Sequence, residues 1–285
     1  MSGIMKSLAE CGKKSFNLIR NHPAVMLPFF LLAIMEGISL SIWYYAPRPP
    51  LSAVLSPLIK AFAGEQFLHY PLNFLILPRL LFISRLMVYF SFGLMAAGMT
   101  VCSVYQIEVE KRTVGFWGNF NRAVRRYLSL LALGLIYALF SLLIYKVPRI
   151  IIARFFIASP FAGYLFAVVF FVSFVGMVFC EGLSIYAVAY MVILRQGIFA
   201  GYKKGFLFFK KNFITVFLLL LFFRAFNAGL IIIKNKLPVL IKEFFPVFPE
   251  ITLFVLGTEI AVLFLANFFI ALLACELLVV KKDEL

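Results

Sequence analysis

Six ionisable side chains stand inside long apolar runs of the sequence, where chemistry or tight pairing has to account for them: Glu36, Arg85, Glu181, Arg224, Glu259 and Glu276. A charge at the centre of a lipid bilayer costs roughly 2.5–3.5 kcal/mol on insertion scales, so such groups face partners or water. Two interpretations follow. Either these side chains line a polar pathway for an ion, a solute or a lipid headgroup, or they form ion pairs that lock helices together.

The apolar runs carry no stripe of Ser, Thr, Asn and Gln beside these charges, which favours structural ion pairs. Depth along each helix axis predicts which charges pair. At about 1.5 Å per residue, Arg224 lies roughly 16 Å from the inner edge of the hydrocarbon and Glu259 roughly 18 Å. By the same measure Glu36 and Arg85 lie at roughly 18 and 21 Å. We therefore expect the pairs Arg224–Glu259 and Glu36–Arg85.

Catalytic chemistry has few side chains to draw on. The single aspartate is Asp283, near the C-terminus, and the two histidines, His22 and His69, lie outside the apolar runs. Paired aspartates, histidine zinc sites and Ser-His pairs therefore lack their residues. The sequence contains neither a GxxxxGKS or GxxxxGKT phosphate loop nor a GxSxG elbow, and its four cysteines form no CxxC pair. We expect no enzyme, and no catalytic, cofactor-binding or metal-binding residue.

Composition places these charges in a membrane protein. Hydrophobic residues make up 64% of the 285 residues and charged residues 14%, whereas soluble domains are roughly half apolar and a quarter charged. The apolar runs leave no polar stretch long enough for a soluble domain, so we expect one integral membrane domain over 1–285. The net charge of +15 lies beside the ends of the apolar runs, which favours anionic membrane lipids over nucleic acid as partners.

About six runs are long enough to cross a bilayer, and they predict an all-α, polytopic transmembrane helical bundle. The predicted spans cover residues 24–46, 79–105, 127–147, 161–194, 213–233 and 251–280. Prolines and polar residues break up 51–78, which predicts an interfacial hairpin or a partly re-entrant segment. We expect Pro148 to end the third span and 148–160 to form a short interfacial helix. The run 161–194 exceeds one membrane thickness, so one helix should span and then project beyond the bilayer.

Three segments share one pattern, a basic amphipathic start followed by an aromatic residue and a hydrophobic run, at 12–33, 118–140 and 201–223. They predict a threefold internal repeat of helix pairs with units of about 1–110, 111–195 and 196–285. In each unit a basic amphipathic helix at the membrane surface leads into a span. We expect lipid-headgroup contacts from the basic residues of these helices, which are Lys13, Lys14, Arg122, Arg125, Arg126, Lys203, Lys204, Lys210 and Lys211.

Glycines recur every fourth residue at Gly197, Gly201 and Gly205. They either line one helix face that allows a neighbour to approach closely or form a flexible connector. Orientation follows from charge, because Lys and Arg are more frequent at the ends of the predicted spans that share a side with the termini. The positive-inside rule then places both termini in the cytoplasm, as an even number of spans requires.

The segment RQGIFAGYKKGFLFFKKNF, residues 195–213, resembles a broad group of prokaryotic six-span membrane proteins that includes the membrane domain attached to some glycerophosphodiester phosphodiesterases. Residues 118–127 match the same pattern more loosely. The resemblance implies six spans and a bacterial or archaeal inner membrane, and it carries over no catalytic residue. We expect a non-catalytic membrane protein that organises lipids or partner membrane proteins; the alternative is a transporter or flippase for a small solute or lipid.

Overall fold

The structure is a computed structural model. It describes residues 2–112, 115–155, 161–194, 196–225, 229 and 250–281, with the side chains of residues 2–8, 155 and 162 left out. Within these ranges every regular element of secondary structure is a helix, which confirms the all-α prediction. The helices are α1 (Ser2–Asn21), η1 (Pro23–Met26), α2 (Leu27–Tyr45), α3 (Ser52–Ala63), η2 (Glu65–Leu68), α4 (Asn73–Val88), η3 (Tyr89–Gly93), α5 (Leu94–Glu108), α6 (Phe116–Val124), α7 (Tyr127–Phe155), α8 (Ala162–Ile193), α9 (Ile198–Lys211) and α11 (Ile251–Val280).

Helices long and apolar enough to cross a membrane confirm a multi-pass membrane protein. They cover Pro23–Tyr45, Asn73–Glu108, Tyr127–Arg154, Gly163–Ile193 and Ile251–Val280. A sixth candidate is the pair Ile198–Lys211 and Phe213–Ala225, whose two helices meet at 94°. The predicted fifth span, 213–233, is described only to residue 225 and at residue 229. The expectation of one continuous helix in 161–194 is confirmed by α8, which is 32 residues long.

Two predicted breaks at proline are wrong. The helix that was expected to start at Arg79 begins at Asn73 and runs through Pro78, and α7 runs through Pro148 to Phe155. The predicted hairpin in 51–78 is therefore limited to α3 and η2, and 148–155 continues α7 instead of forming a separate interfacial helix. Residues 156–160, the rest of that expected helix, lie outside the described ranges. Transmembrane helices tolerate proline where neighbouring groups satisfy the freed carbonyl.

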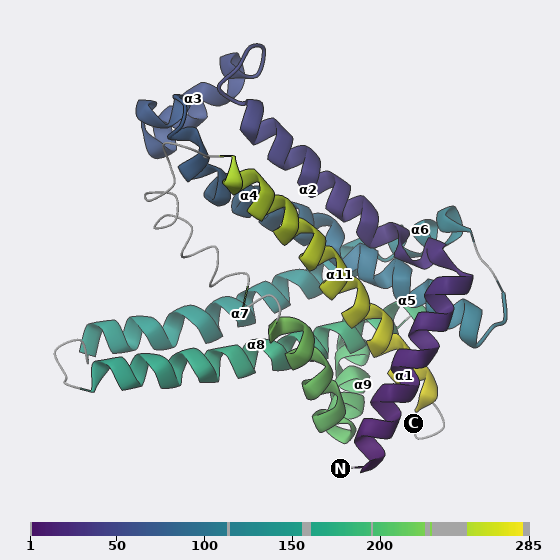
Figure 1. Cartoon of the computed structure of the whole chain (residues 1–285). Helices are drawn as coiled ribbons and strands as arrows, with labels where there is room; N and C mark the ends of the chain where they lie inside the picture. The colour runs from purple at the N-terminus through teal and green to yellow at the C-terminus, as the bar shows by residue number, and fades with distance from the viewer. Residues whose placement is uncertain are drawn as a thin grey trace. The chain divides into compact units, whose positions relative to one another are not determined.

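A hydroxyl on α8 supplies this partner at Pro148. Proline has no amide proton, so the carbonyl of Ile144, one turn earlier, loses its helical donor. The buried hydroxyl of Ser173 donates to the carbonyl oxygen of Ile144 at 2.9 Å. The same bond ties α7 to α8, which lie side by side (Figure 1).

The contacts of the chain divide it into two compact units, neither of which is continuous in sequence. The first unit contains Met1–Met26, Leu94–Phe222 and Phe269–Leu285; the second contains Leu27–Gly93 and Phe223–Phe268. In the first unit α8 packs on α5, α7 and α9, and in the second α2 packs on α4. The units cut across the three sequence repeats, because α11 and the helix Asn73–Glu108 each contribute to both.

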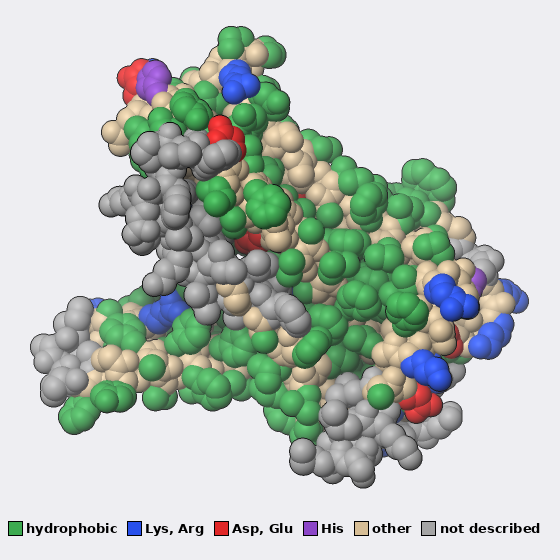
Figure 2. Space-filling model, viewed as in Figure 1, with side chains coloured by type: hydrophobic (Ala, Val, Ile, Leu, Met, Phe, Trp, Pro, Cys, Tyr) green, Lys and Arg blue, Asp and Glu red, His purple; other side chains and the backbone are tan. Residues whose placement is uncertain are grey.

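Much of the helix surface is apolar, as lipid contact requires. Only 17% and 11% of the most apolar stretches of Tyr127–Arg154 and Gly163–Ile193 are buried. Large side chains such as Leu139, Phe170 and Phe171 are more than half exposed. Figure 2 shows hydrophobic side chains over most of the visible helical surface, with Lys and Arg near helix ends. This distribution is typical of helices solvated by hydrocarbon.

The three basic amphipathic helices are α1, α6 and α9, and each leads into an apolar helix. In α1 one face buries Cys11, Ser15 and Leu18 while Lys13 and Lys14 are exposed. Burial raises the pKa of the Cys11 thiol to about 11. In α6 the buried side chain of Asn119 donates to Ser103 Oγ on α5 at 2.7 Å. Both helices thus dock on the protein with one face and present basic residues with the other.

Glycine sets the distance between α9 and α8. A Cβ atom on Gly205 would lie 2.9 Å from the amide nitrogen of Ala187, and one on Gly201 would lie 2.6 Å from Met191 Cγ. Two glycines therefore form the predicted close-packing face, whereas Gly197 precedes the helix in open space. The connector interpretation is wrong for Gly201 and Gly205 because both are buried inside a regular helix.

We predict that the α7–α8 hydroxyl bond matters only because of Pro148. Ser173→Ala should lower the free energy of unfolding by about 1–3 kcal/mol, since it leaves a buried carbonyl without a donor. In a Pro148→Ala background the new amide donates to Ile144, so the same change should cost much less. Thermal unfolding of the four proteins in detergent gives the coupling. Ser41→Ala, which removes an exposed hydroxyl bonded within its own helix, is the control, and an additive cycle would contradict the assignment.

Candidate functional site

One arginine holds two glutamates in the second unit. Arg85 Nε on α4 lies 2.6 Å from Glu36 Oε2 on α2, and Arg85 Nη1 lies 2.7 Å from Glu259 Oε1 on α11. The exposed fractions of the three side chains are 12%, 1% and 10%. The planar guanidinium has several donors in a fixed fork, so one arginine can serve two carboxylates at once. We call these three residues the Arg85 cluster.

The helices that carry the cluster are fixed in register by further contacts. Trp43 Nε1 on α2 donates to Ser84 Oγ on α4 at 2.5 Å, beside Arg85 in sequence. Buried Phe74, Leu77 and Leu81 of α4 pack with Leu256 and Ile260 of α11. Because Arg85 and Leu81 are four residues apart on one helix, the guanidinium lies over the same face as this apolar contact.

A chain of polar groups extends the cluster through the second unit. Arg224 Nη2 donates to Asn267 Oδ1 at 3.3 Å, and Asn267 Nδ2 donates to the Tyr89 hydroxyl at 3.2 Å. That hydroxyl also interacts electrostatically with the carboxylate of Glu36. Tyr89 opens the π-helical turn η3, and single π turns within α-helices often occur at functional positions. Polar side chains from four helical segments therefore meet in one network.

The structure confirms the expected pair Glu36–Arg85 and gives Glu259 a different ion-pair partner. Glu259 was expected to pair with Arg224, but its carboxylate is bound by Arg85, and Arg224 donates to Asn267. Depth counting placed all four charges near mid-bilayer and carried no information about which helix faces meet. Sequence reasoning also missed Tyr89 and Asn267. Asn267 had a signal, as an amide in the apolar run of α11 just over two turns beyond Glu259.

Two of the six intramembrane ionisable residues, Glu181 and Glu276, belong to the first unit, whereas the Arg85 cluster belongs to the second. Glu276 on α11 is fully buried, and neither carboxylate oxygen has a hydrogen-bond partner among the described residues. Its neighbour Cys275 donates through Sγ to the carbonyl of Val101 on α5 at 3.6 Å. Glu181 on α8 is half-buried. The six candidates are therefore divided between the two units.

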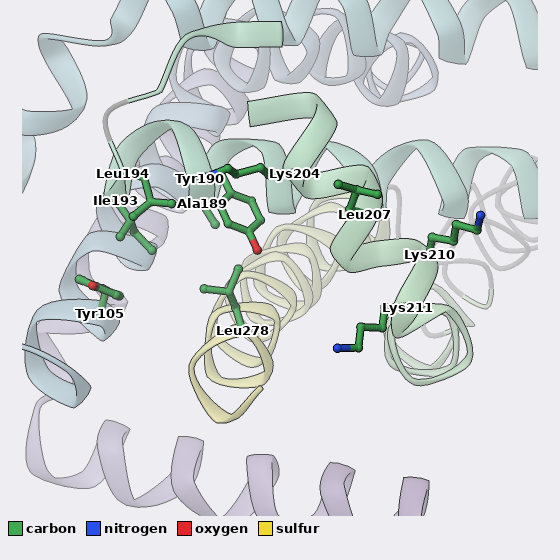
Figure 3. A pocket seen from close by; sticks show the side chains of 10 residues that line it. All are labelled: Tyr105, Ala189, Tyr190, Ile193, Leu194, Lys204, Leu207, Lys210, Lys211 and Leu278. Carbon is green, nitrogen blue, oxygen red and sulfur yellow. The ribbon is translucent and has the colours of Figure 1, made fainter. Parts of the chain in front are cut away.

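The nine basic residues that were expected at lipid headgroups lie on α1, α6 and α9 or in the turn after α6. All are exposed except Arg126, which is half-buried. Those of α9 divide further, because Lys204, Lys210 and Lys211 line a cavity of about 790 Å³ and Lys203 does not (Figure 3). The described residues contain no group of three His, Cys, Asp or Glu side chains suited to a metal ion.

No protein-family model matches the chain, and no curated protein sequence or solved structure matches it either. The resemblance of residues 195–213 to the membrane domain attached to some phosphodiesterases thus stays a prediction.

We predict that the Arg85 cluster locks α2, α4 and α11 together. Arg85→Leu removes the guanidinium that binds two carboxylates in the hydrocarbon region, and it should destabilise the protein by about 3–5 kcal/mol. Replacing Glu36, Arg85 and Glu259 together by leucine removes every charge of the cluster. It should restore most of the stability that Arg85→Leu loses. The midpoint of thermal unfolding in detergent measures both effects.

The exposed pair Lys60–Glu65 on α3 and η2 provides the control. Lys60 lies 2.5 Å from Glu65 and holds the pKa of that carboxyl below its usual range. Exposed pairs contribute little to stability, so Lys60→Leu should leave the midpoint nearly unchanged. A triple variant as unstable as Arg85→Leu alone would show that the cluster does not serve as a lock.

Proposed function

We propose that this chain is a non-catalytic integral membrane protein that binds and organises anionic lipids. The observation that carries the proposal is the repeated placement of basic side chains, such as Lys13, Arg122 and Lys203, on the exposed face of a docked amphipathic helix. Each basic residue near an anionic membrane surface contributes about 1 kcal/mol of attraction. Three such helices on one chain therefore give a strong local preference for negatively charged headgroups.

Enzymatic chemistry finds little support in the residues that this chain offers. Its ionisable groups inside the apolar helices are glutamates and arginines, and Arg85 holds two of those glutamates in ion pairs. The guanidinium holds the carboxylates of Glu36 and Glu259 in place by hydrogen bonds, so neither can turn freely toward a substrate. We therefore assign no catalytic residue and no cofactor.

Transport is the second candidate, and the polar network of the second unit is the observation that favours it. Arg224, Asn267, Tyr89 and the Arg85 cluster link several membrane helices by polar contacts. Such chains carry ions or protons in transporters. The triple leucine variant separates a structural role of the network from a role in transport. If the variant folds stably but has lost the cellular function of the wild-type protein, the network belongs to transport.

We also propose that the protein lies in a bacterial or archaeal inner membrane with both termini in the cytoplasm. The basic helices α1, α6 and α9 each precede an outgoing span in this topology, in agreement with the positive-inside rule. We predict that a reporter fused after residue 285 and one inserted ahead of α3 report opposite sides of the membrane. Reports from the same side would overturn the even number of spans.

The lipid proposal predicts that basic residues far from the α9 cavity set the composition of the bound lipid. Lys13→Gln and Lys14→Gln on α1, combined with Arg122→Gln on α6 and Arg125→Gln in the turn after it, remove four charges from exposed positions. The protein is extracted with its surrounding lipid in polymer nanodiscs, and the retained lipids are quantified by mass spectrometry. Phosphatidylglycerol should be enriched around the wild-type protein and fall towards its bulk fraction around the variant.

A neutral control is the double variant Lys60→Gln, Glu65→Gln, which removes an exposed ion pair without changing net charge. It should retain the wild-type enrichment. If the wild-type protein shows no enrichment, or if the fourfold variant keeps all of it, the proposed function fails.

A further inference from the structure

The α9 cavity lies wholly within the first unit and has an amphipathic lining. Its apolar walls come from separate helices and include Leu207 of α9, Ile193 of α8 and Leu278 of α11. Its volume of about 790 Å³ is within the range of about 300–1,000 Å³ that is usual for ligand pockets. The glycine contact between α9 and α8 holds two of these walls at a fixed distance.

Positive charge enters the lining from one helix. Lys204 and Lys211 are seven residues apart, two helical turns, and so stand on one face of α9. Lys210 adds a third ammonium group, and the described lining contains no acidic side chain. Figure 3 shows all three lysines coming from α9, with apolar side chains of the other helices around the same space. A ligand for this cavity therefore has negative charge next to an apolar part.

A tyrosine hydroxyl supplies a second, independent indication of a polar ligand. Tyr190 on α8 is only 4% exposed, and its hydroxyl has no hydrogen-bond partner among the described residues. The hydroxyl oxygen is directed into the space lined by Lys204, Leu207 and Leu278 (Figure 3). Leaving a buried hydroxyl without a hydrogen-bond partner is unfavourable, and an ester or phosphate oxygen in the cavity would supply the partner.

We propose that the α9 cavity binds one molecule of an anionic glycerophospholipid. The lysines of α9 hold its phosphate, Tyr190 donates to an oxygen of the headgroup or the ester, and an acyl chain lies along the apolar wall that includes Leu207 and Leu278. Charge complementarity selects this occupant over a zwitterionic lipid. The site rests on the proposed lipid-binding function and adds a specific lipid to the general surface attraction.

Native mass spectrometry of the full chain in detergent, titrated with short-chain phosphatidylglycerol, tests the site. We expect one bound lipid per chain, with phosphatidylcholine bound much more weakly. Lys204→Gln with Lys210→Gln should weaken the binding of phosphatidylglycerol roughly thirty-fold, as expected for two lysines at about 1 kcal/mol each. Lys111→Gln with Arg112→Gln removes as much charge from the exposed segment after α5, outside the lining, and should leave this binding unchanged. Equal losses in the two double variants would overturn the site.

Two single substitutions test the wall and the hydroxyl. Leu207→Trp fills part of the cavity without changing charge and should abolish one-to-one binding. Leu128→Trp, at an exposed position of α7 outside the lining, should leave this binding intact. Tyr190→Phe should weaken binding several-fold through the lost hydrogen bond. Wild-type affinity in Leu207→Trp would overturn the placement of the acyl chain.

Glycerol phosphate and inorganic phosphate distinguish a lipid from a soluble anion. If either competes as strongly as short-chain phosphatidylglycerol, the cavity is a site for soluble phosphate and the lipid proposal is wrong. The outcome for the cavity can also be distinguished from the outcome for the proposed lipid-organising function. Lipid enrichment in nanodiscs without one-to-one binding overturns the cavity alone, and one-to-one binding without enrichment overturns the role of the basic helices.

Discussion

The burial of the Arg85 guanidinium against two carboxylates is the interaction on which the second unit depends. Separating charges in hydrocarbon is unfavourable, so any movement that parts Arg85 from Glu36 or Glu259 exposes a charge to lipid. The three side chains come from α2, α4 and α11. Their pairing therefore restricts both the depth and the rotation of these helices in the membrane. Apolar packing alone specifies depth and rotation only weakly, because lipid tails solvate a leucine side chain as well as a neighbouring helix does.

The helices of the first unit are held together by other interactions. Its helices α8 and α9 approach closely because Gly201 and Gly205 carry no side chain, which gives van der Waals contact where the hydrophobic effect between helices is absent. The hydroxyl of Ser173 ties α8 to α7 in the same unit. Close backbone approach and isolated hydrogen bonds thus hold the helices of this unit together.

Much of this architecture followed from the sequence because the hydrocarbon thickness fixes helix length and apolar composition. The helical bundle, the three basic helices and the pair Glu36–Arg85 were predictable on that basis. The second partner of Arg85 was not, since depth says nothing about which faces of two distant helices meet. Continuity through Pro148 also escaped prediction, because the donor that satisfies Ile144 lies on another helix. The cavity beside α9 depends on side chains from several separate helices, a combination that no single stretch of sequence displays.

The sequence separation between Arg85 and Glu259 has a consequence for biosynthesis. They are 174 residues apart, and translation at roughly 5–20 residues per second places about 10–35 s between their synthesis. During that interval Arg85 has only the carboxylate of Glu36 for neutralisation within this trio. α11 then delivers Glu259 to the second unit and, further along the same helix, Glu276 to the first. The synthesis of α11 therefore completes both units, and a nascent chain that stops before this helix has finished neither.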